Sequence, residues 1–514
     1  MKKNKVYVML AAMAGVFGLT ACQDTDAQYE IPVVAAPDYV SVTPSTSGAL
    51  LYGEKTIRVK FDKRINFMTV NTSQITLNGK PVKKALVLGA DSTLTITADV
   101  SFDKTQKLHI PAGLIANGQG TPYLQDINLT WEVKSLPANE ATAMTGRLGW
   151  GFNLGNHFDT SNMTYGYWDK ATPTATLYTG LAAMGCKTVR MPATWTNHMD
   201  DNGVIDASYM DEVAQNVDWA IAAGLNVILN THHDSFEADM LADASTNPVK
   251  AAEAEALIES VWTQIATKFA DRNEQLIFET FNEVHAGDDW STGSDAQFAT
   301  LNQWNAIAVN AIRATGGNNS TRWIGVSGYA CNIDMAINHL VLPADPANRI
   351  MVSVHCYDPG NFCQKPVNEE DGSLYCNSWG HNADPEHSNS GANEEYIINQ
   401  LYKLRTNYIE KGIPCYIGEY GCVNQTTANA NLFRNYYLEF FCRAAQQAGV
   451  PMFIWDNNAQ ETGNECFGYV NHDDGTFIMD GASLIPMMVR AATSTDSSYD
   501  FYTIWNNSPV YVAE

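Results

Sequence analysis

The stretch Leu276-Ile277-Phe278-Glu279-Thr280-Phe281 leads directly into Asn282 and Glu283, so a short apolar run ends in polar side chains. Seven similar runs, separated by helix-like segments, occur between residues 149 and 455. This alternation predicts βα units around a parallel sheet. Eight such units over about 370 residues are typical of a (β/α)₈ TIM barrel, which we expect over 138–508. The predicted strands are 149–154, 187–191, 226–230, 276–281, 322–327, 351–355, 414–418 and 451–455.

Two segments between these strands show helical periodicity clearly. They are 210–223 and 251–270, and each repeats an apolar residue every four positions, which places those residues on one helix face. The repeating residues are Val213, Val217 and Ile221 in the first segment, and Leu257, Val261, Ile265 and Phe269 in the second.

Residues 38–134 have a period of two instead. Ile57, Val59 and Phe61 alternate with charged residues, and Asn78-Gly79 is a strong hairpin-turn pair because both residues tolerate positive φ. Several short strands in about 95 residues predict a small antiparallel sandwich. Its sequence also resembles bacterial Ig-like domains. Such a domain could bind carbohydrate or act as a spacer, and the lack of a cluster of exposed aromatics favours the spacer.

The first residues have the pattern of an export signal. Three lysines precede an apolar run over 6–19, which is too short to span a bilayer as a mature helix. The run ends in Leu19-Thr20-Ala21-Cys22, which resembles a bacterial lipobox, and the acidic stretch behind it resembles the surface-export signal of Bacteroidetes lipoproteins. We therefore expect a signal peptide over 1–21, a lipidated Cys22 and a tether over 22–37. This predicts an outer-membrane or cell-surface lipoprotein; plain secretion is the alternative.

The charge of the chain excludes some partners. There are 56 acidic and 31 basic residues, which give a formal net charge of −25. Nucleic acids and anionic membrane surfaces attract basic patches, so neither is an expected partner. A neutral polysaccharide is indifferent to this charge.

Nine cysteines remain besides Cys22, so at least one thiol stays free even in an oxidising compartment. Cys363 and Cys376 are the first candidates for a disulfide. Cys356, Cys415 and Cys442 lie in apolar runs, which is typical of buried small side chains. No Cys/His spacing indicates a structural zinc site.

Polar or aromatic side chains of catalytic type follow nearly every predicted strand. In a (β/α)₈ barrel these strand ends meet on one face, where active sites lie. One such residue would mean little, because loops are polar anyway, but agreement across most of the strands is hard to produce by packing alone. The residues are Asn153, Asn156, Arg190, His232, His233, Asn282, Glu283, His355, Tyr357, Glu419 and Trp455.

Glu283 and Glu419 are the candidate catalytic pair. Cleaving a glycosidic bond needs one carboxylic acid to protonate the leaving oxygen and one carboxylate to attack the anomeric carbon. Arg190 is placed to lower the pKa of a neighbouring carboxylate. A surface salt bridge is the alternative for either glutamate taken alone. For His232-His233-Asp234 the alternative is a metal site, but glycoside hydrolysis needs no metal and we expect no cofactor.

Several of these motifs together resemble glycoside hydrolase family 5, over about 145–505. They are Gly151-Phe152-Asn153-Leu154-Gly155-Asn156, Thr188-Val189-Arg190-Met191-Pro192, Asn230-Thr231-His232-His233-Asp234, Phe281-Asn282-Glu283, His355-Cys356-Tyr357, Ile417-Gly418-Glu419-Tyr420-Gly421 and Phe453-Ile454-Trp455-Asp456. The resemblance implies a retaining mechanism with Glu283 as acid/base and Glu419 as nucleophile. It assigns Arg190, Asn282, His355 and the other matching residues to supporting and substrate-binding positions.

The sequences of these motifs are most similar to those of the endoglucanase subfamily that also contains xyloglucan- and lichenan-cleaving enzymes. This implies an endo-β-1,4-glucanase acting on cellulose, mixed-linkage glucan or xyloglucan. We also expect the chain to be a monomer. The chain departs from its relatives at Cys356 and in the long segments 162–169 and 356–393, which leaves the substrate open. A xyloglucan-specific enzyme or a β-mannanase on the same barrel is one alternative. A non-catalytic surface glycan-binding lipoprotein is another.

Overall fold

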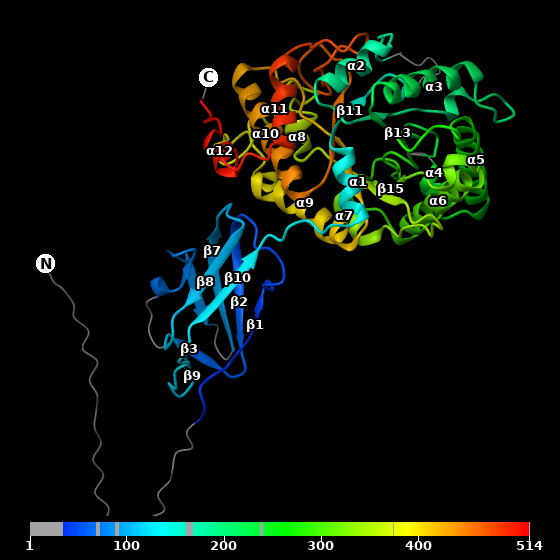
Figure 1. Ribbon diagram of the computed structural model, residues 1–514. Coiled ribbons are helices and arrows are strands. Elements are labelled where there is room, and N and C mark those ends of the chain that lie inside the picture. Colours follow the sequence, from blue (N-terminus) through cyan, green and yellow to red (C-terminus); the bar gives the residue numbers. More distant parts are fainter. Residues whose placement is uncertain are drawn as a thin grey trace, which may run out of the picture.

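The computed structural model describes residues 34–67, 72–87, 92–160, 168–236, 240–373 and 375–512 of the 514-residue chain. Figure 1 shows a small all-β body near the N-terminus and a larger body of helices around a barrel. Within these ranges, no helix is both long and apolar enough to cross a bilayer. The expected signal peptide and Cys22 lie outside the described residues.

The N-terminal body is built from two four-stranded antiparallel sheets that share one core. One sheet has the order β1 (Tyr39–Thr43), β2 (Gly53–Phe61), β7 (Thr93–Val100), β6 (Lys84–Val87). The other has the order β10 (Ile127–Glu132), β8 (Thr105–Ile110), β4 (Thr76–Leu77), β5 (Lys80–Pro81), and β3 (Ile65–Phe67) pairs with β9 (Ile115–Asn117). A short 3₁₀ helix, η1 (Thr72–Gln74), precedes β4.

The predicted period of two is confirmed in this body. Ile57, Val59 and Phe61 are buried in the shared core with Trp131, whereas the residues between them face solvent. The turn at Asn78 (φ 51°) and Gly79 (φ 77°) joins β4 to β5, as the hairpin pair predicts.

The eight predicted parallel strands are also confirmed, and they close into a barrel. The strands pair in sequence order, and the last pairs with the first through contacts such as Gly151 with Phe453. β15 runs further than predicted, because Asn332 still pairs with His355 after an irregular stretch. The strands are β11 (Trp150–Leu154), β12 (Thr188–Met191), β13 (Asn226–Asn230), β14 (Leu276–Glu279), β15 (Ile324–Asn332), β16 (Ile350–Cys356), β17 (Cys415–Tyr420) and β18 (Met452–Asp456).

Helices surround the barrel (Figure 1). They are α1 (Glu140–Leu148), α2 (Ala175–Ala183), α3 (Ala207–Ala222), α4 (Met240–Ala244), α5 (Pro248–Lys268), α6 (Asp295–Ala314), α7 (Ile333–His339), α8 (Gly360–Cys363), α9 (Glu394–Asn407), α10 (Ala428–Ala448), α11 (Gly481–Thr493) and α12 (Phe501–Asn506). Short 3₁₀ turns lie at η2 (Thr196–His198), η3 (Gly317–Ser320), η4 (Ser390–Ala392) and η5 (Ile409–Lys411). The two predicted helices match α3 and α5, but each begins earlier because Asp206 and Asn247 cap its N-terminus.

One end of the barrel is closed by α1. Met144 and Leu148 of α1 form an apolar cluster with side chains at the start of the strands, including Ile277, Met351 and Phe453. This plug seals the N-terminal end of the barrel. Polar side chains are therefore left to gather at the opposite end, where the strands finish.

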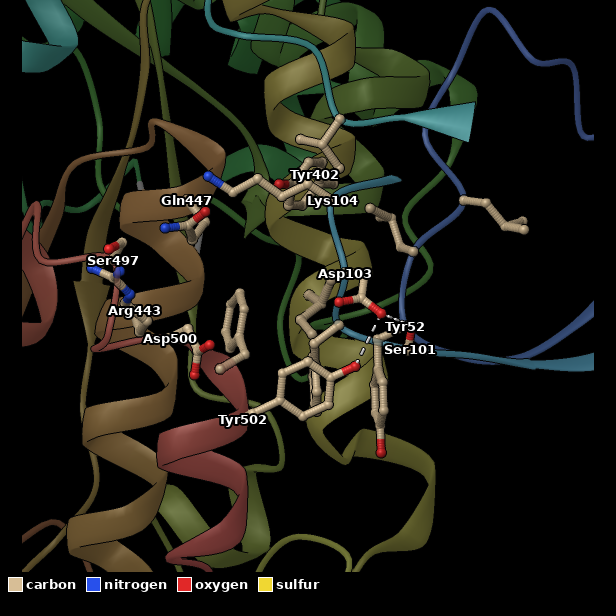
Figure 2. A pocket seen from close by; sticks show the side chains of 16 residues that line it. Tyr52, Ser101, Asp103, Lys104, Tyr402, Arg443, Gln447, Ser497, Asp500 and Tyr502 are labelled. Atoms are coloured by element: carbon tan, nitrogen blue, oxygen red, sulfur yellow. Dashed lines mark hydrogen bonds between the residues drawn. The ribbon is translucent and has the colours of Figure 1, made fainter. Parts of the chain in front are cut away.

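The two bodies touch through aromatic side chains. Phe102 of the all-β body stacks on Tyr52 (ring centroids 3.8 Å apart) and on Phe501 of α12 (5.4 Å). Figure 2 shows the pocket of about 310 Å³ at this junction, where the Tyr502 hydroxyl donates a hydrogen bond to Asp103 (3.3 Å). A salt bridge between Lys55 and Glu395 adds a charged contact between the bodies.

All nine cysteines in the described residues are free, so the predicted Cys363–Cys376 disulfide is wrong. The Cys376 thiol donates to the carbonyl of Ser378 (3.3 Å), whereas the Cys363 thiol lies against that of Cys422. Cys356, Cys415 and Cys442 are buried, as predicted.

Candidate active site

The eleven predicted site residues meet at the C-terminal end of the barrel. Eight of them line one open cleft of about 620 Å³: Asn156, His232, His233, Asn282, Glu283, Tyr357, Glu419 and Trp455. The other three lie beneath it and hydrogen-bond to the two glutamates or their neighbours: Asn153, Arg190 and His355. The cleft is also lined by Trp168, Lys170, Gln364, Asn457 and Glu465, which the sequence did not single out.

Glu419 is held by two donors at the bottom of the cleft. Arg190 Nη1 donates to Oε1 (2.5 Å) and the Tyr357 hydroxyl donates to Oε2 (3.0 Å). Only 7% of the glutamate side chain is exposed. The two donors fix the direction of the carboxylate, so this group is suited to act as a nucleophile.

Arg190 is fully buried and its donors are all directed at acceptors. Besides Glu419 it donates to Glu279 from Nε (3.0 Å) and Nη2 (2.7 Å), to Asn153 (3.0 Å) and to Asn282 (2.9 Å). Burial alone would lower the pKa of Arg190, but the carboxylates of Glu279 and Glu419 outweigh it and hold this pKa well above its ordinary value. The guanidinium thus stays charged and fixed in direction.

Glu279 is a member of this network that the sequence analysis missed. It is fully buried inside β14, and besides Arg190 it accepts hydrogen bonds from Asn230 (3.0 Å), Ser353 (2.8 Å) and Tyr416 (2.7 Å). Burial alone would raise the pKa of Glu279, but the charge of Arg190 outweighs it and the pKa is lowered. The signal in the sequence was a charged residue within an apolar run, which is costly unless the charge is paired.

Glu283 has different surroundings. His355 Nδ1 lies 2.6 Å from its Oε1 and 3.6 Å from Glu419 Oε2. The Glu283 side chain is 22% exposed, against 7% for Glu419. Ligand atoms of Glu283, His355 and Glu419 all lie within 4.8 Å of one another. Two neighbouring carboxylates in unlike environments can divide the acid and nucleophile roles of glycoside hydrolysis.

His232 and His233 form one wall of the cleft. The His232 ring lies parallel to that of Trp455 (5.9 Å, 11°), and its Nδ1 is 3.2 Å from Asn230 Nδ2. Burial lowers the pKa of His232 well below its ordinary value, and the nearby charges of His233 and Arg190 lower it further. The ring is therefore neutral at physiological pH.

Asp234, which follows these histidines in the sequence, binds a neighbouring loop. Its Oδ1 accepts hydrogen bonds from the backbone N–H groups of Trp195 (2.8 Å) and Thr196 (2.6 Å). The carboxylate beside the histidines is instead Asp159, whose Oδ2 is 3.9 Å from His232 Nε2 and whose pKa burial raises to about 6. One atom each from Asp159, His232 and His233 lies within 4.8 Å of the others, so these residues could supply ligands to a cation.

A buried ion-pair network centred on His472 includes Asp456, the residue after Trp455. His472 Nδ1 lies 2.6 Å from Asp169 Oδ2, and its Nε2 lies 3.2 Å from Asp456 Oδ1. Burial alone would lower the pKa of His472, but these two carboxylates raise it to about 10. The network ties the segment after β11 to the segment after β18. No local pattern could have revealed it, because Asp169 and His472 are far apart in the sequence.

The backbone at Gly155 passes so close to Trp455 that only glycine fits at this position. A Cβ on Gly155 would lie 2.7 Å from both the Trp455 ring and the Asp456 carbonyl oxygen. The Gly155 N–H donates to that same carbonyl (2.9 Å), and Asn156 follows with φ 62°. The backbone of this turn therefore supports the Trp455 ring directly.

Comparisons with known proteins agree with this geometry. A family model described as cellulase (glycosyl hydrolase family 5) matches residues 117–461. Endoglucanase A of Paenibacillus barcinonensis is 31% identical over 352 residues, which are 64% of this chain and 86% of that protein.

Two solved structures are also similar. A native Bacteroidetes-affiliated GH5 cellulase linked with a polysaccharide utilization locus aligns with TM-score 0.68 and 34% identity, over 73% of this chain and 98% of that one. A GH5-4 broad-specificity endoglucanase from Bacteroides salanitronis aligns with TM-score 0.65 and 37% identity, over 70% of this chain and 97% of that one.

Proposed function

This chain belongs to glycosyl hydrolase family 5, and we propose that it is a retaining endo-β-1,4-glucanase that cuts internal bonds of a plant cell-wall β-glucan. The observation that carries the proposal is the pair Glu283 and Glu419. One oxygen of each carboxylate lies within 4.8 Å of one oxygen of the other, and their hydrogen-bond partners differ. This spacing fits the ~5–5.5 Å between the carboxyl groups of retaining enzymes rather than the ~6.5–9.5 Å of inverting ones.

The reaction runs in two displacements. Glu419 attacks the anomeric carbon while Glu283 donates its proton to the departing glucosyl oxygen, which leaves a covalent glycosyl-enzyme. Glu283, now ionised, then takes a proton from water. That water attacks the same carbon, releases the sugar and restores Glu419 as the carboxylate.

The other cleft residues hold the two carboxylates and the sugar. Arg190 and Tyr357 hold the Glu419 carboxylate in a fixed direction, and Asn153 helps to hold Arg190. Asn282 accepts a hydrogen bond from Arg190, which fixes its amide for a contact with the sugar 2-hydroxyl. Trp455 offers a flat apolar face to the pyranose ring, with His232, His233 and Asn156 on the adjoining wall.

The substrate proposal is supported by the names of the similar proteins, which are cellulases and endoglucanases. An open cleft also suits an enzyme that binds within a chain. A xyloglucan-specific enzyme, a β-mannanase and a non-catalytic glycan-binding protein are the rivals. Rates on barley glucan, cellulose, xyloglucan and mannan separate the enzymes, and inactivity on all four would leave only the binding protein.

The stereochemistry of the first product tests the mechanism. Proton NMR taken early in the hydrolysis of a β-glucan oligosaccharide is expected to show the β-anomer first, with the α-anomer appearing only by mutarotation. An α-anomer at the earliest time points would mean single displacement and would remove the covalent role of Glu419.

We also propose that the chain is a monomeric lipoprotein of the outer membrane or cell surface. The lipobox ending in Cys22, the polar segment over 22–37 and the Ig-like character of residues 38–134 support an anchor, a tether and a spacer. In cells fed an alkyne fatty acid, wild-type protein is expected to become labelled and Cys22→Ser is not. Equal labelling of the two would contradict the anchor, and light scattering of the protein without residues 1–22 tests the monomer.

A further inference from the structure

We propose that Cys363 and Cys422 are a modification site, where thiol–disulfide exchange links the segment after β16 to the segment after β17. The inference rests on the proposed export of the chain, because exported proteins meet an oxidising compartment. Both thiols are free and fully buried in the structure. Neither takes part in the proposed reaction, so the fold places two nucleophilic groups together that catalysis does not use.

The backbones at the two cysteines are hydrogen-bonded to each other. The Val423 N–H donates to the carbonyl oxygen of Cys363 (2.9 Å), and the Cys422 thiol donates to the carbonyl of Phe362 (3.6 Å). Gln425 adds to this contact, because its Nε2 donates both to the Phe362 carbonyl (2.9 Å) and to Cys422 Sγ (3.7 Å). A disulfide needs Cα atoms about 4.4–6.8 Å apart, a separation typical of segments joined by backbone hydrogen bonds.

The two side chains also face each other. The Cys363 thiol is in hydrogen-bond contact with that of Cys422, and burial together with this contact raises the pKa of Cys363 well above its ordinary value. A buried thiol of this kind stays protonated, whereas the thiolate is the attacking species in exchange. Exchange is therefore expected while the chain folds, before the two thiols are buried.

Other thiols of the barrel are directed at backbone groups. Cys376 donates to the carbonyl of Ser378 (3.3 Å), and Cys415 donates to the carbonyl of Leu404 (3.9 Å). Each of these thiols would have to leave its acceptor to reach a second sulfur. Cys363 and Cys422 need no such movement, so the fold favours this pair.

The oxidant is a small-molecule or protein disulfide. The thiolate of one cysteine attacks the donor, whose S–S bond breaks and releases one thiol. The second cysteine then attacks the mixed disulfide, which forms the Cys363–Cys422 bond and releases the other thiol of the donor. The two cysteines thus give up two protons and two electrons, and the donor disulfide is reduced to two thiols.

The main effect of the bond should be on stability. A cross-link between distant residues removes conformations from the unfolded chain. It also joins the two segments that meet in the hydrogen bond from the Tyr357 hydroxyl to Glu419 (3.0 Å). Because that hydrogen bond is already made while the thiols are free, the bond should preserve the active geometry on heating rather than create it.

The test produces the chain without residues 1–22 in two compartments, the oxidising bacterial periplasm through an added signal peptide and the reducing cytoplasm without one. Free thiols are alkylated in denaturant, and the protein is digested without reduction. Mass spectrometry is expected to find a peptide pair joined through Cys363 and Cys422 in the periplasmic protein only. The melting temperature of that protein should be about 5 °C higher.

Cys422→Ala and Cys415→Ala are the matched variants, since each removes one buried thiol and only the first removes the pair. Cys415→Ala should still form the cross-link, and its two preparations should still differ in melting temperature. Cys422→Ala should lose both the cross-link and that difference. A merely structural role of the Cys422 side chain would lower both melting temperatures and leave their difference unchanged.

Full alkylation of Cys363 and Cys422 in the periplasmic protein, or a bond from either of them to Cys376, would overturn the proposal. Rates on barley glucan, measured on the same preparations, separate this result from the proposed function. A cross-linked chain that leaves glucan intact would contradict the enzyme and keep the disulfide. An active chain with free thiols from both compartments would do the reverse.

Discussion

The two glutamates of the cleft differ in burial and in hydrogen-bond partners. Under Glu419, a fully buried arginine and a second buried carboxylate, Glu279, are tied into a network that leaves the nucleophile little freedom. Around Glu283, the partners are His355 at the carboxylate and His285 at the backbone carbonyl. One carboxylate must keep a fixed charge and direction, whereas the other must exchange a proton with sugar and then with water. The difference in burial follows this division of labour.

Glu419→Gln tests the role of Glu419 as nucleophile and should have the largest effect on the rate. The amide cannot attack the anomeric carbon, yet it keeps nearly the same size and can still accept the hydrogen bond from Arg190. We expect kcat to fall by about a thousandfold or more, as happens when a nucleophile is removed. Glucan affinity, measured by calorimetry, should stay within a few-fold of wild type. Full activity of this variant would contradict the assigned role.

Glu283→Gln tests the role of Glu283 as the acid that protonates the leaving group. A sugar alkoxide is a poor leaving group and needs a proton, so the rate on barley glucan should fall by about 10²–10⁴-fold. On 2,4-dinitrophenyl β-cellobioside the phenolate leaves unaided, so the first step should be largely preserved and a burst of dinitrophenol should appear. Equal losses on the two substrates would mean that Glu283 is not the acid.

The buried network under Glu419 should also carry stability. In Glu279→Gln, Arg190 loses one of its two carboxylate partners while remaining fully buried. Breaking a buried charge pair in this way costs roughly 3–5 kcal/mol in the free energy of unfolding. Glu274→Gln is the control, because Glu274 is 74% exposed and its pair with Arg147 is at 3.6 Å. Chemical denaturation should show a loss near zero for the control, and similar values for the two variants would refute the contribution of the network.

The sequence predicted the barrel and the eleven site residues because both follow from strand order. Each strand is a short apolar run, and its end must lie at one face of the barrel, so Arg190, Glu283 and Glu419 could be brought together without coordinates. Glu279 was missed because it lies inside such a run, and a run of that kind is first taken for core. The Cys363–Cys376 pair was wrong because proximity in the sequence does not fix where a thiol points.

The network of His472 was missed for a different reason. Its partner Asp169 follows the first strand of the barrel and its partner Asp456 ends the last one, and these strands become neighbours only when β18 pairs with β11. Closure of the barrel therefore creates a contact that no window of sequence contains. Asp159, which follows β11, lies beside His232, which follows β13, and the two residues are likewise far apart in the sequence.

The His472 network should make the free energy of unfolding depend on pH. Its folded pKa of about 10 exceeds the unfolded value of about 6.5, so its contribution is complete below pH ~6.5 and is lost as pH rises through 10. We expect the free energy of unfolding to drop by roughly 2–4 kcal/mol between pH 7 and pH 10 from this group. His472→Gln should be less stable than wild type at pH 7 but vary less over that range. Parallel pH curves for the two proteins would contradict it.

The contact between the two bodies should matter least for catalysis. Phe102 fills the aromatic junction with Tyr52 and Phe501, on the side of the molecule where the all-β body meets α9, α10 and α12 rather than the cleft (Figures 1 and 2). Phe102→Ala removes these stacking contacts, each worth about 0.5–1.5 kcal/mol beyond area burial, so the bodies should separate more readily. Small-angle scattering should then show a larger radius of gyration.

Because none of the cleft residues touches the junction, kcat/KM on barley glucan should stay within about twofold of wild type for Phe102→Ala. An unchanged rate together with a looser shape would agree with a body that acts as a spacer. A large drop in the rate on polymeric glucan, with the rate on the dinitrophenyl cellobioside preserved, would instead mean that the all-β body holds the polymer. The proposed spacer would then have to be abandoned for a binding module whose orientation the aromatic junction sets.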